Sequence, residues 1–302
     1  MEIYNVAFLG TLPTTPHVIT RGIWAGGYTN SPSANLDIMD FATIQTASNA
    51  TDFGDLTVAR TTAAGVSSDT RGCIGGGDIP SAYSNVIDYV TISVLSNATD
   101  FGDLTLSRNS IGAVDNRVRG VWIGGYDGSN TNVMDYVTIS VLSNATDFGN
   151  LIPATRLNSG LSDRTGGRGC TGSGWVSGAT NNINYITIST LSDSSDFGDL
   201  TVARYNTGTA SSDTRGIWAG GNGNKDVMDY ITIASTGNAT DFGNMSVGIS
   251  GCGGNSDLSR GVFAGGWITN AMEYITISSL GNGTNFGDLT LARDAPAGGL
   301  TG

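Results

Sequence analysis

Positive charge is scarce in this chain. Its 302 residues hold 26 acidic side chains against 14 basic ones, of which only Lys225 is a lysine, so the formal net charge is −12 at pH 7. A protein that binds nucleic acid needs clustered lysine and arginine to neutralise the phosphates. The sequence therefore predicts no nucleic-acid partner, and its excess of carboxylates favours a well-solvated surface.

Histidine and cysteine are rarer still. His17 is the only histidine, which excludes oxidases that hold copper between two histidines. The three cysteines, Cys73, Cys170 and Cys252, form no close pair, so we expect buried small residues rather than a disulfide or a metal site. The Gly-x-Ser-x-Gly pattern of serine hydrolases occurs nowhere in the sequence. We therefore predict no cofactor and no catalytic residues. Two acids on one face would still suffice for a less favoured alternative, an enzyme acting on carbohydrate.

Long apolar runs are also missing. No segment approaches the roughly 18 apolar residues that a membrane-spanning helix requires. Near the N-terminus, Glu2 stands where a secretory leader carries positive charge, and no long apolar stretch follows it. The sequence thus predicts neither membrane insertion nor a signal peptide.

What the sequence has in abundance is repetition. Each repeat begins with Arg-Gly, three mostly apolar residues and a glycine pair. A segment with an acid, an aromatic residue and Thr-Ile comes next, and Asp-Phe-Gly follows it. This order returns every 45 to 50 residues, in copies that begin at Arg21, Arg71, Arg119, Arg168, Arg215 and Arg260. Short segments of β-branched and aromatic residues with paired glycines at such a period are typical of a β-propeller, with one four-stranded blade per repeat.

Each repeat supplies four candidate strands, which we name a to d from the axis outward. Strand a is rich in Ala, Gly, Ser and Thr, as in residues 59–67 and 203–211, because small residues suit the crowded axis. Strand b opens with Arg-Gly, strand c carries the acid and the aromatic residue, and strand d carries Asp-Phe-Gly. We expect the Phe of strand d to fill the space between neighbouring blades.

Two further repeated features have structural interpretations. The Asp of strand d is expected to cap a turn and to pair with a repeat arginine; these acids include Asp52, Asp100 and Asp196, and the arginines Arg60, Arg108 and Arg204. Five Asn-x-Thr tripeptides between strands c and d match the glycosylation pattern, but their regular placement indicates turns. They begin at Asn49, Asn97, Asn144, Asn238 and Asn282.

The order of the strands predicts how the ring closes. The chain supplies b, c and d before its first a strand, and the last a-type segment, 291–300, follows the sixth d strand. That segment should pair with the first b strand near Ile23, which leaves no open sheet edge. We therefore predict an all-β, six-bladed propeller over residues 21–302, with four antiparallel strands per blade. Residues 1–20 remain as an N-terminal arm, which either docks on a neighbouring subunit of a homo-oligomer or folds back over its own ring.

The repeats differ mainly between strands b and c. The stretch between the glycine pair and the acid of strand c shortens along the chain from 12 residues to 6. An antiparallel meander places these variable loops on one face, where binding residues concentrate. Five aromatic residues in or beside the loops are therefore candidates to stack on sugars or to anchor a protein: Tyr28, Tyr83, Tyr126, Trp175 and Trp267. The alternative is that they only cover the tops of the blades.

The register of the repeats resembles the kelch repeat over residues 21–302. The third copy, Arg-Gly-Val-Trp-Ile-Gly-Gly-Tyr at 119–126 with Asp-Tyr-Val-Thr-Ile-Ser at 135–140 and Asn-Ala-Thr-Asp-Phe-Gly at 144–149, is similar to kelch-like arrays in virion proteins of marine bacteriophages. Strand d departs from the usual kelch pattern, with Phe where Trp is common. The resemblance implies a non-enzymatic virion component assembled in the host cytoplasm. It implies a structural protein of a tail, a fibre or the capsid surface that contacts other virion proteins or a host glycan or protein. A cellular protein-interaction scaffold is the alternative.

Overall fold

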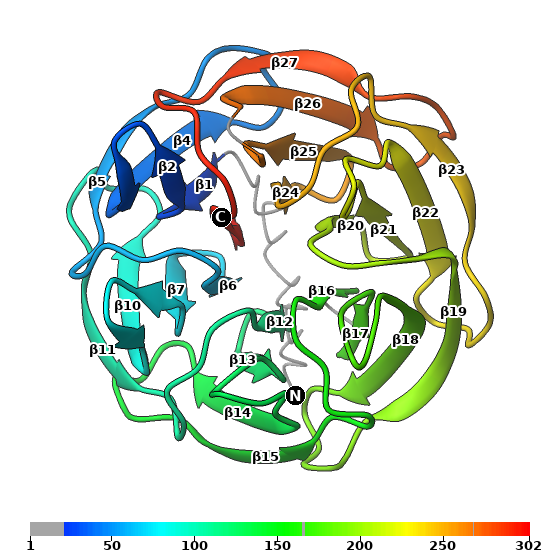
Figure 1. The fold of residues 1–302 in the computed structure, drawn as a ribbon, viewed down its shortest axis with the longest axis horizontal. Helices are drawn as coiled ribbons and strands as arrows, with labels where there is room; N and C mark the ends of the chain where they lie inside the picture. Colours follow the sequence, from blue (N-terminus) through cyan, green and yellow to red (C-terminus); the bar gives the residue numbers. More distant parts are fainter. Residues whose placement is uncertain (1–20, 165–166, 268) are drawn as a thin grey trace, which may run out of the picture.

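The chain folds as a ring of six four-stranded antiparallel sheets around a common axis (Figure 1). The computed structural model describes residues 21–164, 167–267 and 269–302, and no helix occurs in this part of the chain. The predicted six-bladed, all-β propeller is confirmed. The arm predicted at residues 1–20, and His17 with it, lie outside the described residues.

The strands repeat in length and in order from blade to blade. The a strands are β28 (Ala297–Thr301), β6 (Ala64–Ser67), β12 (Gly112–Asp115), β16 (Ser159–Ser162), β20 (Gly208–Ser211) and β24 (Gly253–Ser256). The b strands are β1 (Arg21–Ala25), β7 (Arg71–Gly75), β13 (Arg119–Ile123), β17 (Arg168–Gly172), β21 (Arg215–Ala219) and β25 (Arg260–Ala264). The c strands are β4 (Ile38–Thr43), β10 (Val86–Thr91), β14 (Val133–Thr138), β18 (Thr180–Thr187), β22 (Val227–Thr232) and β26 (Ala271–Thr276). The d strands are β5 (Thr51–Asp55), β11 (Thr99–Asp103), β15 (Thr146–Asn150), β19 (Ser195–Arg204), β23 (Thr240–Asn244) and β27 (Thr284–Asp288).

Blade 1 is assembled from both ends of the described chain. β28 pairs antiparallel with β1, with Ile23 opposite Leu300 and Ala25 opposite Ala297. The a strands are shorter than the sequence suggests: β6 covers only the end of 59–67, and β20 only the end of 203–211. The residues before them form the connections from d to a, because each connection must descend from the rim to the axis.

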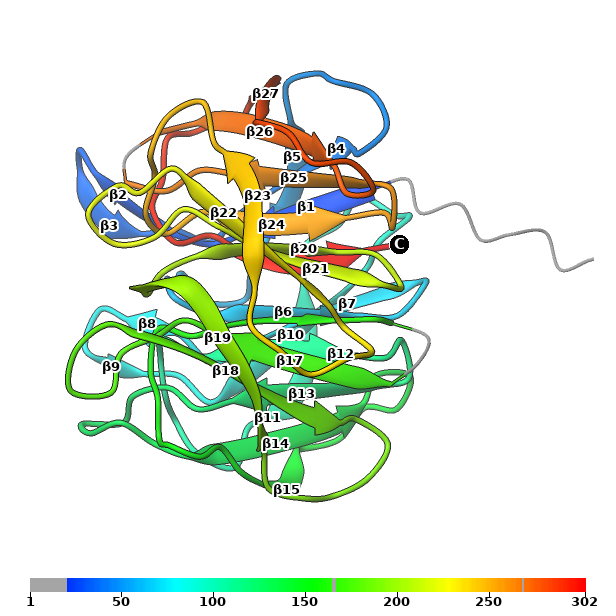
Figure 2. The same ribbon diagram turned by 90° about the vertical axis from the view of Figure 1, so that its right-hand side faces the viewer.

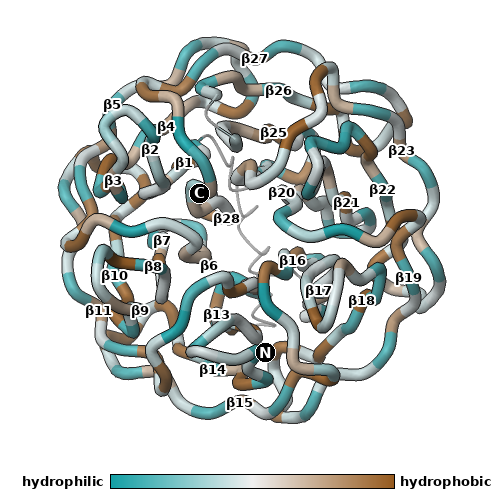
Figure 3. The backbone as a smooth tube through the Cα atoms, viewed as in Figure 1, coloured by the Kyte–Doolittle hydropathy of each residue, from teal (hydrophilic) through white to brown (hydrophobic). Residues whose placement is uncertain are grey.

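Most of the hydrophobic core lies between the blades. Six clusters of buried residues each combine side chains of two neighbouring blades. The strand-d Phe is buried as expected; Phe53, for example, is 2% exposed and packs with Val90 and Ile92 of the next blade. Figure 3 shows hydrophobic segments in all six sectors of the ring rather than in one central core.

Tryptophans insert at every second junction. The indole of Trp122 in blade 3 is fully buried, and its Nε1 donates to the Ala64 carbonyl of blade 2 at 3.0 Å. Trp218 and Trp24 repeat this contact with blades 4 and 6. The indole of Trp122 lies over Gly75, where a Cβ atom would stand 2.7 Å from it. Blades therefore alternate between one that inserts a tryptophan and one that receives it.

The arginine that opens each repeat joins its blade to the next. Its guanidinium lies 4.3 to 4.8 Å from the ring centre of the aromatic residue in strand c. It also donates, over 2.7 to 3.1 Å, to the carbonyl of an Ile just after strand c of the following blade. Arg260 donates to Ile44 in this way and links blade 6 to blade 1.

Buried ion pairs correct one expectation. Arg60, Arg108 and Arg204 pair with acids of strand c rather than with Asp52, Asp100 and Asp196 of strand d. Their partners are Asp88, Asp135 and Asp229, at 2.6, 2.6 and 2.8 Å, and the Arg293–Asp40 pair is equivalent at 3.0 Å. All eight side chains are fully buried, whereas the strand-d acids point to solvent. The difference arises because the connection from d to a carries each arginine inward over the next blade.

The remaining repeated residues have structural roles. The side-chain oxygens of Asn49, Asn97, Asn144, Asn238 and Asn282 accept hydrogen bonds from backbone N–H groups of the preceding blade, consistent with turns. Gly54 of Asp-Phe-Gly has φ +138°, and a Cβ there would meet the Ser96 carbonyl at 2.5 Å, so only glycine fits. The three cysteines are free and buried, as expected, and burial raises each thiol pKa to about 12.

The two faces of the ring differ. The b–c loops and the d–a connections share one face, which we call the variable face. In blades 1 and 2 its loops form the hairpins β2 (Tyr28–Asn30) with β3 (Ser33–Asn35) and β8 (Asp78–Ile79) with β9 (Ala82–Tyr83). Figure 2 shows both hairpins on the side opposite the C-terminus. The c–d turns, most of which carry the repeated Asn-x-Thr tripeptide, lie on the other face together with the a–b turns, and we call this the uniform face.

Candidate functional site

The variable face has a regular backbone framework. The residue after each glycine pair, or its equivalent, donates its backbone N–H to the d–a connection that arrives from the preceding blade, and in blades 1 to 4 it also accepts a backbone hydrogen bond in return. Tyr126 pairs in this way with Asn109, and Trp175 with Arg156. The framework holds side chains of the loop and of the connection next to each other, at positions where the repeats vary most.

Five side chains form a continuous row across this face, which we call the aromatic row. It consists of Tyr83, Tyr126, Arg156, Trp175 and Tyr205. The rings of Tyr83 and Tyr126 meet edge to face at 5.9 Å, and those of Trp175 and Tyr205 at 5.4 Å. The Arg156 guanidinium bridges the two pairs, 4.6 Å from the Tyr126 ring centre and 5.9 Å from that of Trp175. The row runs from blade 2 to the connection that enters blade 5.

Arg156 is the electrostatic centre of the row. Within the described residues it makes no ion pair, in contrast to the four fully buried arginines of the core. Its Nε is buried without a hydrogen-bond partner, and so is Oδ1 of Asn109 beside Tyr126. A half-buried guanidinium between two aromatic faces presents donors to an acceptor-rich ligand, while the rings supply apolar contact.

The structure brings together three of the five predicted residues, namely Tyr83, Tyr126 and Trp175. Tyr28 and Trp267 occupy the same backbone position in blades 1 and 6, but neither has a ring contact with the row among the described residues. Trp267 is 63% exposed and lines a separate cavity at the junction of blades 5 and 6.

Sequence reasoning missed two members of the row, Arg156 and Tyr205. Both stand on d–a connections, directly after the position that holds the buried arginine in most repeats. The signal that marks them is the variation of the residue after the buried-arginine position. In chain order that residue is Thr61, Asn109, Arg156, Tyr205, Ser250 and Asp294.

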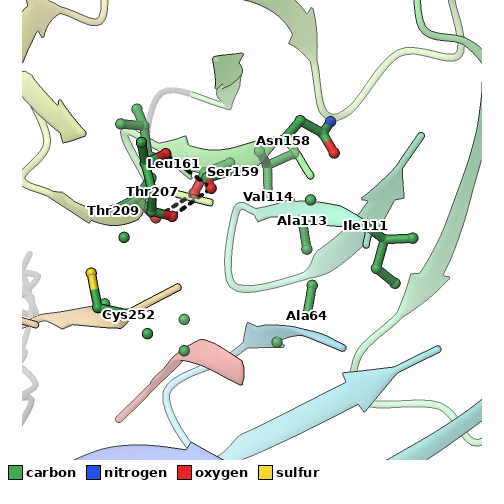
Figure 4. A pocket seen from close by; sticks show the side chains of 18 of the residues that line it. Ala64, Ile111, Ala113, Val114, Asn158, Ser159, Leu161, Thr207, Thr209 and Cys252 are labelled. Atoms are coloured by element: carbon green, nitrogen blue, oxygen red, sulfur yellow. Dashed lines mark hydrogen bonds between the residues drawn. The ribbon is translucent and has the colours of Figure 1, made fainter. Parts of the chain in front are cut away.

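A second candidate is the central channel, a cavity of about 150 Å³ lined by the a strands. Most residues of its wall are small, and neighbouring blades are joined by hydrogen bonds along it. Figure 4 shows Ser159, which donates to the Thr207 carbonyl at 2.6 Å, beside Thr209 and Leu161. This volume holds on the order of ten water molecules. The channel therefore suits bound solvent better than an organic ligand.

One mouth of the channel, on the uniform face, is polar. The last residue of each a strand is buried there: Ser67, Asp115, Ser162, Ser211, Ser256 and Thr301. The Arg164 guanidinium donates to Ser67 Oγ and Thr301 Oγ1 across the mouth. Burial, the larger influence, raises the pKa of the Asp115 carboxyl, and the charge of Arg164 partly offsets it. The Arg164 side chain thus links blade 4 to blades 1 and 2 on the uniform face.

Two further features are absent from the described ranges. No group of three or more His, Cys, Asp or Glu residues there has the geometry of a metal site. No helix in those ranges is long and apolar enough to cross a membrane.

The chain is a six-bladed β-propeller whose variable face carries the aromatic row. The chain matches no model of a known protein family, and a search of curated proteins found no match.

Proposed function

We propose that this protein is a non-enzymatic binding module of a virus particle, and that the aromatic row contacts a glycan on the host surface. The observation that carries the proposal is the cation–aromatic row itself, with an Arg156 guanidinium that has no acidic partner in the described chain.

The chemistry of the row supports a carbohydrate ligand. Sugars present apolar C–H faces that stack on Tyr and Trp, and hydroxyl or carboxylate oxygens that accept from a guanidinium. Tyr, Trp and Arg are also the residue types that dominate the binding energy of interfaces. The edge-to-face contacts hold the rings in place, so that binding costs little side-chain entropy.

The assignment to a virion is supported by the resemblance of the repeats to kelch-like arrays of marine bacteriophages. A closed ring with ion pairs and arginine links between its blades is also a rigid platform for display. For residues 1–20 we propose docking on a neighbouring virion subunit. Deletion of residues 2–18 should then lower the oligomer mass measured in solution, and an unchanged mass would rule out that docking.

A glycan array tests the proposed function. The labelled protein should bind selectively, and Trp175→Ala should weaken binding about thirtyfold, the equivalent of about 2 kcal/mol for a central anchor residue. Trp267→Ala is the matched control, because it removes an exposed indole at the same backbone position outside the row. Absence of selective binding, or equal binding by wild type and Trp175→Ala, would overturn the proposal.

A further inference from the structure

One junction carries a buried acid without the arginine that balances it elsewhere. Between blades 5 and 6, Ile249 stands where four junctions have the buried arginine, while Glu273 keeps the acidic position of strand c. Glu273 is 8% exposed and accepts hydrogen bonds from the backbone N–H and the hydroxyl of Ser246. Among the described residues, it forms no ion pair.

The junction of blades 3 and 4 differs from that of blades 5 and 6 in the residue at the acidic position. That junction also lacks the arginine, with Thr155 in its place, but there the acid has become the neutral Asn184. Both charges of the pair are therefore absent at this junction. Their joint absence avoids the free-energy cost of a buried charge without a partner. At Ile249 only the cation is lost.

A cavity of about 340 Å³ opens at the junction of blades 5 and 6. Glu273 lines it, and Trp267 and Val247 stand at its more exposed side. Its volume falls at the lower end of the range of about 300 to 1,000 Å³ that is typical of small-ligand sites.

The cavity retains the acceptor groups of a guanidinium site. At the junction of blades 1 and 2, the Arg60 guanidinium donates to the carbonyls of Ile74, Gly76 and Val86 at 3.2, 3.3 and 2.8 Å, besides its pair with Asp88. The equivalent residues of blade 6 all line the cavity: Phe263, Gly265, Ala271 and, for the acid, Glu273.

Neighbouring residues are adjusted to this arrangement. Ile249 packs against Gly266, as the methylene groups of Arg204 pack against Gly221, so it replaces the stem of an arginine but not its head. Gly283 stands where four other repeats have alanine, and a Cβ atom at that position would collide with Glu273 Oε2. Glycine at 283 thus makes room for the longer carboxylate.

We propose that this cavity binds a guanidinium or primary ammonium group of a ligand, with Glu273 as its counter-ion and Trp267 stacked on the entering chain. A guanidinium, which fills the equivalent position at four other junctions, matches these carbonyl and carboxylate acceptors better than an ammonium does. The site is separate from the aromatic row, so it stands or falls independently of glycan binding.

Calorimetric titration with agmatine, together with Trp267 fluorescence, tests the proposal. Wild-type protein should bind agmatine, and Glu273→Gln should weaken binding about tenfold or more, because a charge-assisted hydrogen bond is lost. Ile249→Arg should abolish agmatine binding and raise the denaturation midpoint, since the chain then fills the site with its own guanidinium. Asp226→Asn, which neutralises an exposed acid of blade 5, should leave binding unchanged.

Three results of these titrations would contradict a guanidinium site. No agmatine binding by the wild type, or equal affinity in Glu273→Gln, would overturn the proposal, as would full agmatine binding by a folded Ile249→Arg variant. A short peptide with one central arginine distinguishes the source of the group. Tighter binding of the peptide assigns it to a side chain of a partner protein, and tighter binding of agmatine assigns it to a small amine.

Discussion

The buried ion pair between Arg108 and Asp135 provides the sharpest stability prediction. Arg108 Nη1 lies 2.6 Å from Asp135 Oδ2, and both side chains are fully buried. Nε and Nη2 of Arg108 donate to the carbonyls of Gly124 and Trp122, and the backbone N–H of Thr105 donates to the carboxylate. The pair thus links the connection that leaves blade 2 to strand c of blade 3.

Removal of one charge should cost far more than removal of both. Asp135→Asn leaves the guanidinium buried without a counter-charge, which costs about 3 to 5 kcal/mol, and Arg108→Met leaves the carboxylate in the same position. The double variant replaces the pair with an apolar stem and a neutral amide, so we expect a loss of only about 1 to 2 kcal/mol. The junction at Thr155 and Asn184 already has a neutral combination of this kind.

Urea denaturation followed by circular dichroism measures the four free energies of unfolding from midpoint and slope. The double variant should be more stable than either single variant. If the two single losses simply add in the double variant, the pair is not an energetic unit and this account of the junction is wrong.

Three further predictions concern the core and its titration. Gly75→Ala places a Cβ against the Trp122 indole and should lower the free energy of unfolding in urea by about 1 to 3 kcal/mol. Gly178→Ala is the control and should cause no such loss, because a Cβ there has no neighbour within 4 Å. Equal losses in the two variants would contradict the packing of Trp122 against Gly75. The three thiols, with pKa values of about 12, should resist a thiol reagent such as DTNB at pH 8 until urea unfolds the protein, and fast labelling of the native form would refute their burial. These thiols are Cys73, Cys170 and Cys252. Burial raises the pKa of Asp294, so the contribution of this carboxyl to stability is present below its unfolded-state pKa and is lost as pH rises through its folded-state pKa. Asp294→Asn should therefore stabilise the protein more at pH 7 than at pH 3. The opposite order of the two free-energy changes in urea denaturation would be inconsistent with this pKa shift.

Features that repeat along the chain could be predicted from the sequence. The period, the paired glycines and the strand-d Phe depend on short-range patterns that every blade repeats, and six copies reinforce each other. The role of the Phe followed because one aromatic side chain per blade at a fixed register can only form a packing layer.

Contacts between blades could not be predicted to the same extent. Asp52 and Asp88 are both plausible partners for Arg60 in sequence, and only the path of the d–a connection over the next blade selects Asp88. The aromatic row depends on the same geometry. Arg156 reaches both Tyr126 and Trp175 because its connection runs between two loops that are far apart in the chain.

The central claim is that a closed ring brings loops from successive blades onto one face. Hydrogen exchange at β1 and β28 tests it most directly, because these strands come from opposite ends of the described chain and share blade 1. We predict that peptides covering 21–25 and 297–301 are protected as strongly as those covering β12 and β13 of blade 3. Exchange of 297–301 at the rate of an unpaired segment would contradict the closed ring.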